Sequence, residues 1–472
     1  MFRNRQRELG YLERRYARPG AEFAVLYGRR RVGKSSLIYE WCREKPRLYF
    51  FAARLPSQAL LHEFGQQLAV ALGEPGRTFA DWDSALLALA ELGRVRTPDE
   101  GSKRFVVVID EYPYLADSVP GFSTLLQRAW DTVLQHTNLF LCLTGSTYSV
   151  MRREILDGAA PLYRRHTWAY ELLPLQPSDL RAFFPALDGE QLIETYAVLG
   201  GMPRNLLALD TGRSLVRNIE REILDPAGNL FSEVRLLLHE ELKGEVDAFS
   251  RVLEAIAAGN HQRQEIAAAA NLTLASAQHY LNDLVTNGLV EHRLPLNRVR
   301  EEGRIGTYHI LDPFLRFWHR WAAPHRALLE INQRQAETLS EVRNNLPYIV
   351  APVWEALARQ HLLVASGRGQ IPFPVQEVGS WWARGAQVDV VGVNRADHRV
   401  VFGEARWRST PVTIADLHAL MEKGLLWLKG DTARWDVHYA FFARNVGQVE
   451  EAGLGEENVH LFTPEDVTSV GA

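Results

Sequence analysis

A glycine-rich segment near the N-terminus holds the residues whose types and spacing most clearly predict chemistry. Its pattern is G-x-x-x-x-G-K-[ST], formed by Gly28, Arg29, Arg30, Arg31, Val32, Gly33, Lys34 and Ser35, with Ser36 next. Glycines let such a segment curl until several backbone N–H groups point at phosphate oxygens. A helix that begins there adds its partial positive charge. We expect these residues to bind a nucleotide, with Lys34 bridging the β- and γ-phosphates and the Ser35 hydroxyl holding Mg²⁺.

Two adjacent carboxylates form a second candidate site. Asp110 and Glu111 directly follow an apolar run at 105–109, which predicts a buried central strand whose carboxyl end faces a ligand. We expect Asp110 to bind Mg²⁺ through water and Glu111 to polarise the water that attacks the γ-phosphate. The alternative is a strand that ends in a solvated acidic turn, and the upstream phosphate loop disfavours it.

Three polar residues further along the chain could complete this site. Thr144 and Ser146 follow the apolar run at 139–143 and could orient the attacking water and sense the γ-phosphate. A strand-to-helix turn also needs small polar residues, so a structural role is equally consistent. Arg165 could reach the nucleotide of its own chain or that of a neighbouring subunit, or it could lie in a solvated basic turn.

A parallel sheet is needed to position these candidates. Apolar runs predict strands at 23–27, 48–52, 105–109 and 139–143, and helical periodicity predicts helices up to Tyr16 and over 57–72, 79–92 and 122–135. Strands that alternate with helices indicate an α/β fold class with a parallel sheet. The glycine-rich segment then lies between a strand and a helix, which argues against an incidental turn before Lys34. Residues 97–102 are predicted to form an exposed loop.

Composition is that of a globular protein, with 46% hydrophobic and 23% charged residues. A length of 472 residues suggests about three domains. The net charge of −4 gives no overall basic field for nucleic acid, although a local basic face stays open. Cys42 and Cys142 are the only cysteines, which disfavours a disulfide scaffold or a cysteine zinc site. The sequence has no signal-peptide pattern and no apolar run of roughly 18 residues, so we predict a cytoplasmic protein without a membrane span.

The order of the motifs resembles that of the archaeal-type ATPase family, AAA+-related P-loop proteins close to the STAND signalling class. The shared motifs are Asn4-Arg5 with Glu8-Leu9, residues 28–35, Asp110-Glu111, Thr144-Gly145-Ser146 and Gly200-Gly201-Met202-Pro203. The resemblance implies ATP as the ligand, Asn4 and Arg5 near the adenine, and Pro203 close to the nucleotide in a helical lid. The family often has Tyr-Gly-Arg-Arg where this chain has Tyr163-Arg164-Arg165-His166. Arg165 matches the first family arginine, but the glycine is lost.

A helical lid is predicted at 177–245 and a winged helix at 246–312. The winged helix combines three helices, at 248–257, 263–270 and 274–287, with a hairpin of residues 289–293 and 307–310. DNA affinity rests largely on phosphate neutralisation, and the expected recognition helix at 274–283 has no Lys or Arg. The wing has Arg293, Arg298, Arg300 and Arg304, partly offset by Glu301 and Glu302. DNA binding and packing against protein therefore both stay open.

The C-terminal part resembles the PD-(D/E)xK restriction-endonuclease-like domain attached to this ATPase family, a domain of unknown function. An aromatic helical connector, predicted at 313–345 after Asp312, leads into this domain at 346–472. The resemblance implies that Asp389 and Glu404 hold a second divalent metal ion, with Glu355 as an outer contact. Arg406 stands where active members have lysine, and arginine, with a pKa above about 12, cannot act as a general base. A metal-dependent nuclease and an inactive nuclease fold used for docking are both consistent with this pattern.

The sequence therefore predicts an ATPase core at 1–176 followed by four further parts. We expect a switch in which the nucleotide state sets the orientation of the lid and the winged helix, and so exposes or hides the C-terminal domain. One alternative is a DNA-directed enzyme, and the other is a signalling or scaffolding protein with protein partners only. The partner and the oligomeric state stay open.

Overall fold

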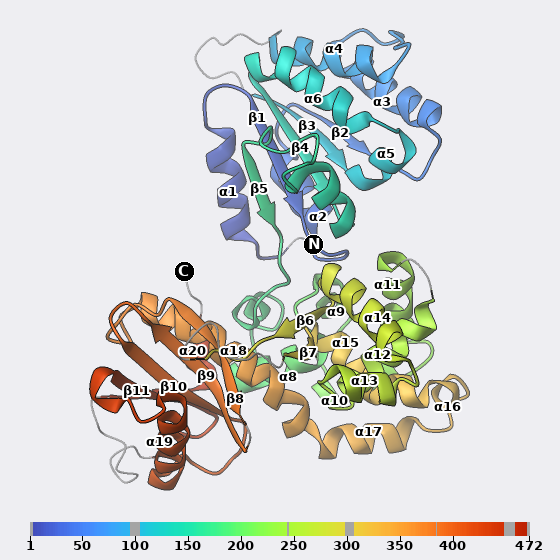
Figure 1. Cartoon of the computed structure of the whole chain (residues 1–472). Coiled ribbons are helices and arrows are strands. Elements are labelled where there is room, and N and C mark those ends of the chain that lie inside the picture. Colours follow the sequence, from blue (N-terminus) through green and yellow to red (C-terminus); the bar gives the residue numbers. More distant parts are fainter. Residues whose placement is uncertain are drawn as a thin grey trace. The chain divides into compact units, whose positions relative to one another are not determined.

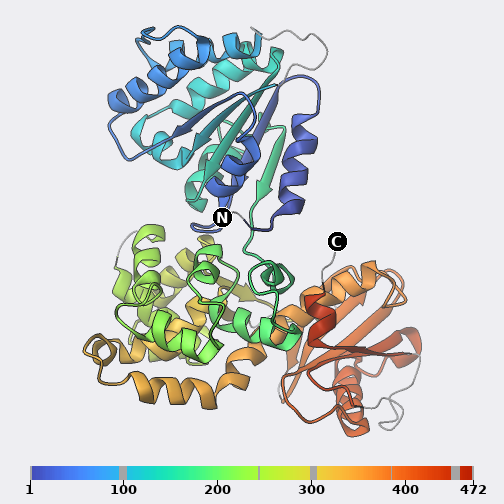
Figure 2. The same cartoon turned by 180° about the vertical axis from the view of Figure 1, so that it is seen from behind.

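The structure is a computed structural model that describes residues 3–94, 104–242, 245–297, 306–383, 385–447 and 458–469. The chain divides into two compact units, Met1–Pro174 and Leu175–Ala472, which are described separately below. Figure 1 labels the elements, and Figure 2 gives the view from behind. The loop predicted at 97–102 lies outside the described residues.

A five-stranded parallel sheet forms the centre of the first unit. Its strands are β1 (Glu22–Tyr27), β2 (Arg47–Phe51), β3 (Phe105–Asp110), β4 (Leu139–Gly145) and β5 (Trp168–Glu171), in the order β2-β3-β4-β1-β5. All neighbouring pairs are parallel, so the carboxyl ends of the strands meet at one edge. β3 and β4 are buried along their whole length, as expected for central strands covered on both faces.

Helices cover both faces of this sheet (Figure 1). On one face lie α1 (Gln6–Tyr16) and α2 (Lys34–Cys42), where Trp41 packs against Phe140 with ring centroids 4.9 Å apart. The other face is covered by α3 (Ser57–Leu72), α4 (Trp82–Arg94), α5 (Tyr112–Ser118) and α6 (Phe122–Thr132). Short helical turns follow at η1 (Leu134–His136), α7 (Tyr148–Met151) and η2 (Arg152–Leu156). The sequence did not predict α5 or β5, and the helix expected to reach residue 135 ends at Thr132.

The second unit begins with helices that share one apolar core. The first group is η3 (Pro177–Ala182), α8 (Gly189–Leu199), α9 (Pro203–Leu207), α10 (Leu215–Asn218), η4 (Ile219–Leu224) and α11 (Glu233–Glu241). A three-helix module with a hairpin follows, consisting of α12 (Val246–Ala257), α13 (Arg263–Ala269), α14 (Leu274–Thr286), β6 (Val290–Arg293) and β7 (Thr307–Ile310). Next come α15 (Pro313–Phe317), η5 (Trp318–Ala322), η6 (Ala323–His325), α16 (Arg326–Glu330) and α17 (Gln335–Asn344). A single buried cluster runs through all three groups and on into the C-terminal sheet, with Leu192, Leu253, Phe317 and Val401 among its members.

A mixed sheet forms the C-terminal part of the second unit. Its order is β12-β11-β10-β9-β8, made of β8 (Glu377–Ala383), β9 (Ala386–Asn394), β10 (Arg399–Arg406), β11 (Asp436–Ala443) and β12 (Val459–Phe462). α18 (Leu346–Gly367) packs on one face, α19 (Ile414–Leu428) on the other, and η7 (Thr432–Arg434) and α20 (Pro464–Thr468) complete the fold. The predicted α/β fold class, with a parallel sheet and a separate C-terminal sheet, is confirmed. The finer domain boundaries stay predictions.

Two motifs noted in the sequence have structural explanations here. A Cβ atom on Gly201 would lie 1.9 Å from the carbonyl oxygen of Leu175, whose own N–H donates to the Gly201 carbonyl at 2.8 Å. Glycine at 201 is therefore required by close backbone packing. The Asp312 carboxylate caps α15 by accepting from the N–H groups of Phe314 and Leu315 at 2.9 and 3.3 Å, which is a structural role. None of the helices in the described ranges has the length and apolar character to cross a membrane.

Candidate functional site

The glycine-rich segment forms a curled loop between β1 and α2. Its φ angles are positive at Gly28 (148°), Arg31 (66°) and Gly33 (97°), and α2 starts directly after Gly33. A Cβ atom on Gly28 would lie 2.4 Å from the Leu172 carbonyl oxygen, so only glycine fits there. The loop thus ends at the N-terminus of a helix, where unpaired N–H groups favour an anion.

Lys34 is buried in the first turn of α2 and bonds back to the loop. Its Nζ donates to the carbonyl oxygens of Gly28 at 2.9 Å and Arg29 at 3.0 Å. The ammonium therefore lies inside the curl, where a phosphate group would also lie. Ser35 is half-buried beside it and Ser36 is exposed.

Asp110 ends β3 and is only 1% exposed. Its Oδ2 accepts from the Tyr49 hydroxyl at 2.6 Å, and its Oδ1 accepts from the Thr144 hydroxyl and from the Glu111 N–H at 3.1 Å. Burial, and then the charge of Asp110, raise the pKa of Tyr49, so the phenol stays a donor. Tyr49 was missed in the sequence because its place beside Asp110 follows from the pairing of β2 with β3.

Glu111 lies at the turn from β3 into α5, with a φ angle of 55°. The Ser146 hydroxyl donates to Glu111 Oε2 at 2.8 Å. β4, which carries Thr144 at its carboxyl end, lies between β1 and β3, so the loop, the acids and both hydroxyls meet at one sheet edge. The structure thus brings together Lys34, Asp110, Glu111, Thr144 and Ser146, whose individual roles stay predictions.

Arg165 does not join this group. Arg165 precedes β5. Thr167, two residues later, donates its N–H at 2.8 Å to the carbonyl of Phe23, which lies near the start of β1. Arg165 therefore lies at the opposite edge of the sheet, about 16 Å along β1 from Gly28 at about 3.3 Å per residue. There it pairs with Asp131 at 3.3 Å. The expectation that Arg165 reaches the nucleotide of its own chain is wrong for this geometric reason, and a role toward a neighbouring subunit stays a prediction.

Arg5 stabilises the phosphate loop through hydrogen bonds to backbone carbonyls. Its guanidinium is 7% exposed and donates to the carbonyl oxygens of Val32 at 3.1 Å and Leu173 at 2.8 Å, and it pairs with Glu8 at 3.3 Å. The Asn4 side chain accepts from the Arg5 N–H at 2.8 Å. The contact of both residues with adenine stays a prediction. Pro203 begins α9 in the second unit, so its contact with the nucleotide also stays a prediction.

The predicted C-terminal carboxylates lie on neighbouring antiparallel strands. β9 and β10 pair up to Val390 and Gly403, which places Asp389 beside Glu404. Asp389 accepts from the Ala405 N–H at 3.1 Å and from the Gln387 amide at 3.2 Å. Glu404 pairs with Lys423 of α19 at 2.9 Å and with Arg406 at 3.4 Å. Lys423 was missed because only the packing of α19 on the sheet brings it to Glu404.

Glu355 of α18 is the third predicted carboxylate. Burial, and then the charge of Asp389, raise its pKa to about 7, against the opposing effect of Arg359, Arg293 and Arg316. Burial, and then Glu404, also raise the pKa of Asp389. Within the described ranges, which include these carboxylates, no three His, Cys, Asp or Glu side chains are disposed to hold a metal ion. The expected second metal site at Glu355, Asp389 and Glu404 is therefore not supported.

The segment that leaves β6 is fixed to the C-terminal sheet. Leu296 donates its N–H to the Ser380 carbonyl and accepts from the Trp427 indole, both at 2.8 Å, and Asn297 accepts from Arg395 at 2.8 Å. Arg293 pairs with Glu291. The other wing arginines, Arg298, Arg300 and Arg304, and Glu301 and Glu302 lie outside the described residues. The contacts of Leu296 and Asn297 favour packing of this segment against the protein over DNA binding.

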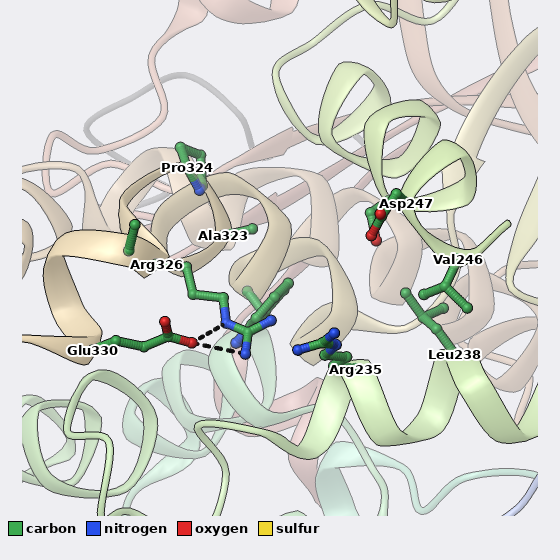
Figure 3. A pocket seen from close by; sticks show the side chains of 11 residues that line it. Arg235, Leu238, Val246, Asp247, Ala323, Pro324, Arg326 and Glu330 are labelled. Atoms are coloured by element: carbon green, nitrogen blue, oxygen red, sulfur yellow. Dashed lines mark hydrogen bonds and ion pairs between the residues drawn. The ribbon is translucent and has the colours of Figure 1, made fainter.

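A cavity of about 470 Å³ lies among α11, α12 and the helical segment from η5 to α16. Figure 3 shows Arg235 and Arg326 extending toward one another there, with Arg326 paired to Glu330 at 2.8 Å. None of the residues predicted from the sequence to bind a ligand lines this cavity.

Residues 2–209 match the sequence model of an ATPase domain found predominantly in Archaea, and residues 318–417 match archaeal and bacterial proteins of unknown function. The N-terminal region is thus similar to ATPase domains of the archaeal type. Uncharacterized protein MJECL04 of Methanocaldococcus jannaschii is 28% identical over 410 residues, 86% of this chain and 88% of that protein. Uncharacterized ATP-binding protein MJ0423 of the same organism is 49% identical over 45 residues, 10% of this chain and 76% of that protein. Among solved structures, the Walker-type ATPase paby2304 of Pyrococcus abyssi has a TM-score of 0.48 at 20% identity, covering 67% of this chain and 96% of that chain. The resemblance to archaeal-type ATPases is confirmed at the level of this domain, whereas a nuclease-like C-terminal domain is not.

Replacing Arg5 by glutamine is expected to destabilise the first unit strongly. The change removes the buried cation of the Glu8 carboxylate, which keeps only the exposed Arg7 at 3.5 Å, and leaves two carbonyls without this donor, so the free energy of unfolding should fall by about 3–5 kcal/mol. Urea unfolding measures this loss. Arg43→Gln is the control, since Arg43 and Glu40 form an exposed pair whose loss should cost at most about 0.5 kcal/mol. Equal effects of the two changes would contradict the bracing role of Arg5.

Proposed function

We propose that this protein binds ATP with Mg²⁺ at the carboxyl edge of its parallel sheet and hydrolyses it. The observation that carries the proposal is the meeting of the Lys34 loop with Asp110 and Glu111 across β4. The match of residues 2–209 to an ATPase domain supports the same conclusion.

The residues present fit a magnesium nucleotide. Ser35 lies in the first turn of α2, and Asp110 is an acceptor held in place by Tyr49 and Thr144. Together they would hold Mg²⁺, with Asp110 acting through water, and the ion would neutralise charge on the phosphates. Lys34 and the loop amides would bind the β- and γ-phosphates.

Glu111 would accept a proton from the water that attacks the γ-phosphate. The Ser146 hydroxyl, 2.8 Å from the Glu111 carboxylate, would hold that carboxylate and help to orient the water. Thr144 bonds to Asp110 and would keep the magnesium-side carboxylate in position. An arginine from a neighbouring subunit, with Arg165 as the candidate, could add positive charge only if the protein oligomerises.

We propose further that the nucleotide state controls the second unit as a whole. A single buried cluster joins α8, the three-helix module and the C-terminal sheet, and the segment after β6 is hydrogen-bonded to β8 of that sheet and to α19. This continuity favours a lid that carries the rest of the second unit with it over a winged helix that moves alone. A cytoplasmic location is part of the same proposal.

For the C-terminal sheet we propose docking of a protein partner. Glu404 is neutralised by Lys423 and Arg406, and Asp389 is occupied by an amide and a side-chain donor. Such a donor set fits a structural charge cluster better than a second metal site. A DNA-directed nuclease is the other candidate, and its support is the adjacency of Asp389 and Glu404.

Substituting Lys34 by alanine should abolish nucleotide uptake, because the only lysine inside the loop is removed. Calorimetric titration with ATP and ADP in Mg²⁺ measures this. Lys45→Ala is the matched control, since Lys45 pairs with Glu13 beyond the end of α2.

Glu111→Gln should keep binding but lower ATP turnover by about 10²–10⁴-fold. If folded wild-type protein takes up neither nucleotide, the proposed function is wrong.

Small-angle X-ray scattering should give different profiles with ADP and with a non-hydrolysable ATP analogue. The expected cause is a nucleotide-dependent movement of the second unit as a whole. Lys34→Ala should show one profile under both conditions. Superimposable wild-type profiles would contradict the switch while leaving ATP hydrolysis untouched.

Plasmid DNA should remain uncut by the wild-type protein in either Mg²⁺ or Mn²⁺, and neither duplex nor single-stranded DNA should stimulate ATP turnover. We expect no cleavage because Lys423 and Arg406 pair with Glu404, and no stimulation because the segment after β6 is hydrogen-bonded to other parts of the same chain. Agarose gel electrophoresis and a phosphate-release assay measure the two effects. Cleavage by the wild type that disappears in Asp389→Ala would reject docking in favour of a nuclease.

A further inference from the structure

Tyr114 of α5 lies between two arginines at the same edge of the sheet as Asp110. Its hydroxyl accepts a hydrogen bond from Arg30 of the phosphate loop. The Arg54 guanidinium lies over the Tyr114 ring, 4.6 Å from its centroid. Tyr114 also donates its N–H to the Glu111 carbonyl at 3.0 Å. Tyr114 therefore contacts the phosphate loop, Glu111 and Arg54.

The position of Arg54 follows from the pairing of β2 with β3. Phe51 pairs with Asp110, and Ala52 donates its N–H to the Asp110 carbonyl at 2.9 Å. Arg54 is two residues further on, so it lies at the carboxyl edge, unlike Arg165. Strand neighbours are about 4.8 Å apart, which puts β2 about 14 Å from β1. The Arg54 guanidinium lies on the ring of Tyr114, and the Tyr114 hydroxyl is hydrogen-bonded to Arg30 of the phosphate loop. Tyr114 therefore spans part of the distance between Arg54 and the loop.

Arg54 differs from Lys34 and Arg5 in its contacts. Lys34 is bonded to loop carbonyls, and Arg5 is held by Glu8. Arg54 is exposed, and across the described parts of the chain no carboxylate pairs with it. A contact between an exposed arginine and a ring face is weak, so the guanidinium can exchange it for a stronger partner. A guanidinium has a permanent charge and a planar set of donors that matches phosphate oxygens.

We propose that Arg54 binds the terminal phosphate of ATP from within the same chain, and that Tyr114 holds it ready for that contact. This inference rests on the proposed nucleotide site and adds to it the residue that distinguishes ATP from ADP. Binding of ATP moves the guanidinium from the ring of Tyr114 to the γ-phosphate. ADP lacks this group and leaves Arg54 on the ring.

The test compares affinities for ADP and for a non-hydrolysable ATP analogue by calorimetry in Mg²⁺. Arg54→Gln should weaken analogue binding about tenfold, the scale of one charge-assisted contact, and change ADP binding less than twofold. Arg54→Lys should recover part of the loss, because it keeps the charge without the planar donors. Arg14→Gln is the matched control, since exposed Arg14 stacks on Tyr11 at 5.0 Å on α1, and it should change neither affinity.

Each other outcome has a definite meaning. If wild-type protein binds both ligands and Arg54→Gln keeps the wild-type affinity ratio, the inference is overturned and the nucleotide site stands. If Arg54→Gln weakens both ligands equally and lowers the melting temperature, Arg54 is structural and the inference is again overturned. If the folded wild type binds neither ligand, the nucleotide site itself is wrong and the inference falls with it.

Discussion

The buried carboxylate of Asp110 is the constraint on which the first unit depends. A charge placed at the end of an apolar central strand, 1% exposed, costs several kcal/mol unless donors surround it. The donors come from three neighbouring strands: the Tyr49 hydroxyl from β2, the Thr144 hydroxyl from β4, and the N–H of Glu111 after β3 itself. Only the order β2-β3-β4 supplies all three. The strand order and the chemistry of the edge are therefore two aspects of one requirement.

Features encoded in short stretches of sequence could be predicted. β1, β3 and β4 are buried on both faces and appear as continuous apolar runs, and the phosphate loop has fixed glycines because its backbone needs positive φ angles at Gly28 and Gly33. β5 could not be predicted, because Trp168–Glu171 is a four-residue edge strand, half-buried throughout, with neither an apolar run nor a clear alternation. α5 was missed for a similar reason, since it is short and carries Pro113 in its first turn.

The missed strand also explains why Arg165 was misplaced. In a parallel sheet, a residue that precedes its strand lies at the amino edge and one that follows its strand lies at the carboxyl edge. Without β5, nothing in the sequence says on which side of a strand Arg165 falls. Arg54 follows a strand that was predicted, yet its relevance depends on Tyr114 and on the pairing of β2 with β3. Lys423 and Leu296 likewise contact residues distant in sequence, and no local pattern encodes such contacts.

The second unit places its polar residues where packing needs them, and this bears on how it could respond to a nucleotide. Gly201 leaves no room for a side chain against Leu175, so the backbone that enters the unit is locked to the turn before α9. Asp312 caps α15 beside Gly200, and Arg316 of α15 donates to the Ile349 carbonyl at 2.6 Å on α18, the helix that covers the C-terminal sheet. A displacement at the Gly200–Pro203 turn would therefore pass through close backbone contacts and buried hydrogen bonds. Close-packed interiors have low compressibility and transmit strain, so the route from lid to C-terminal sheet is a continuous packed core, and a free hinge is not needed.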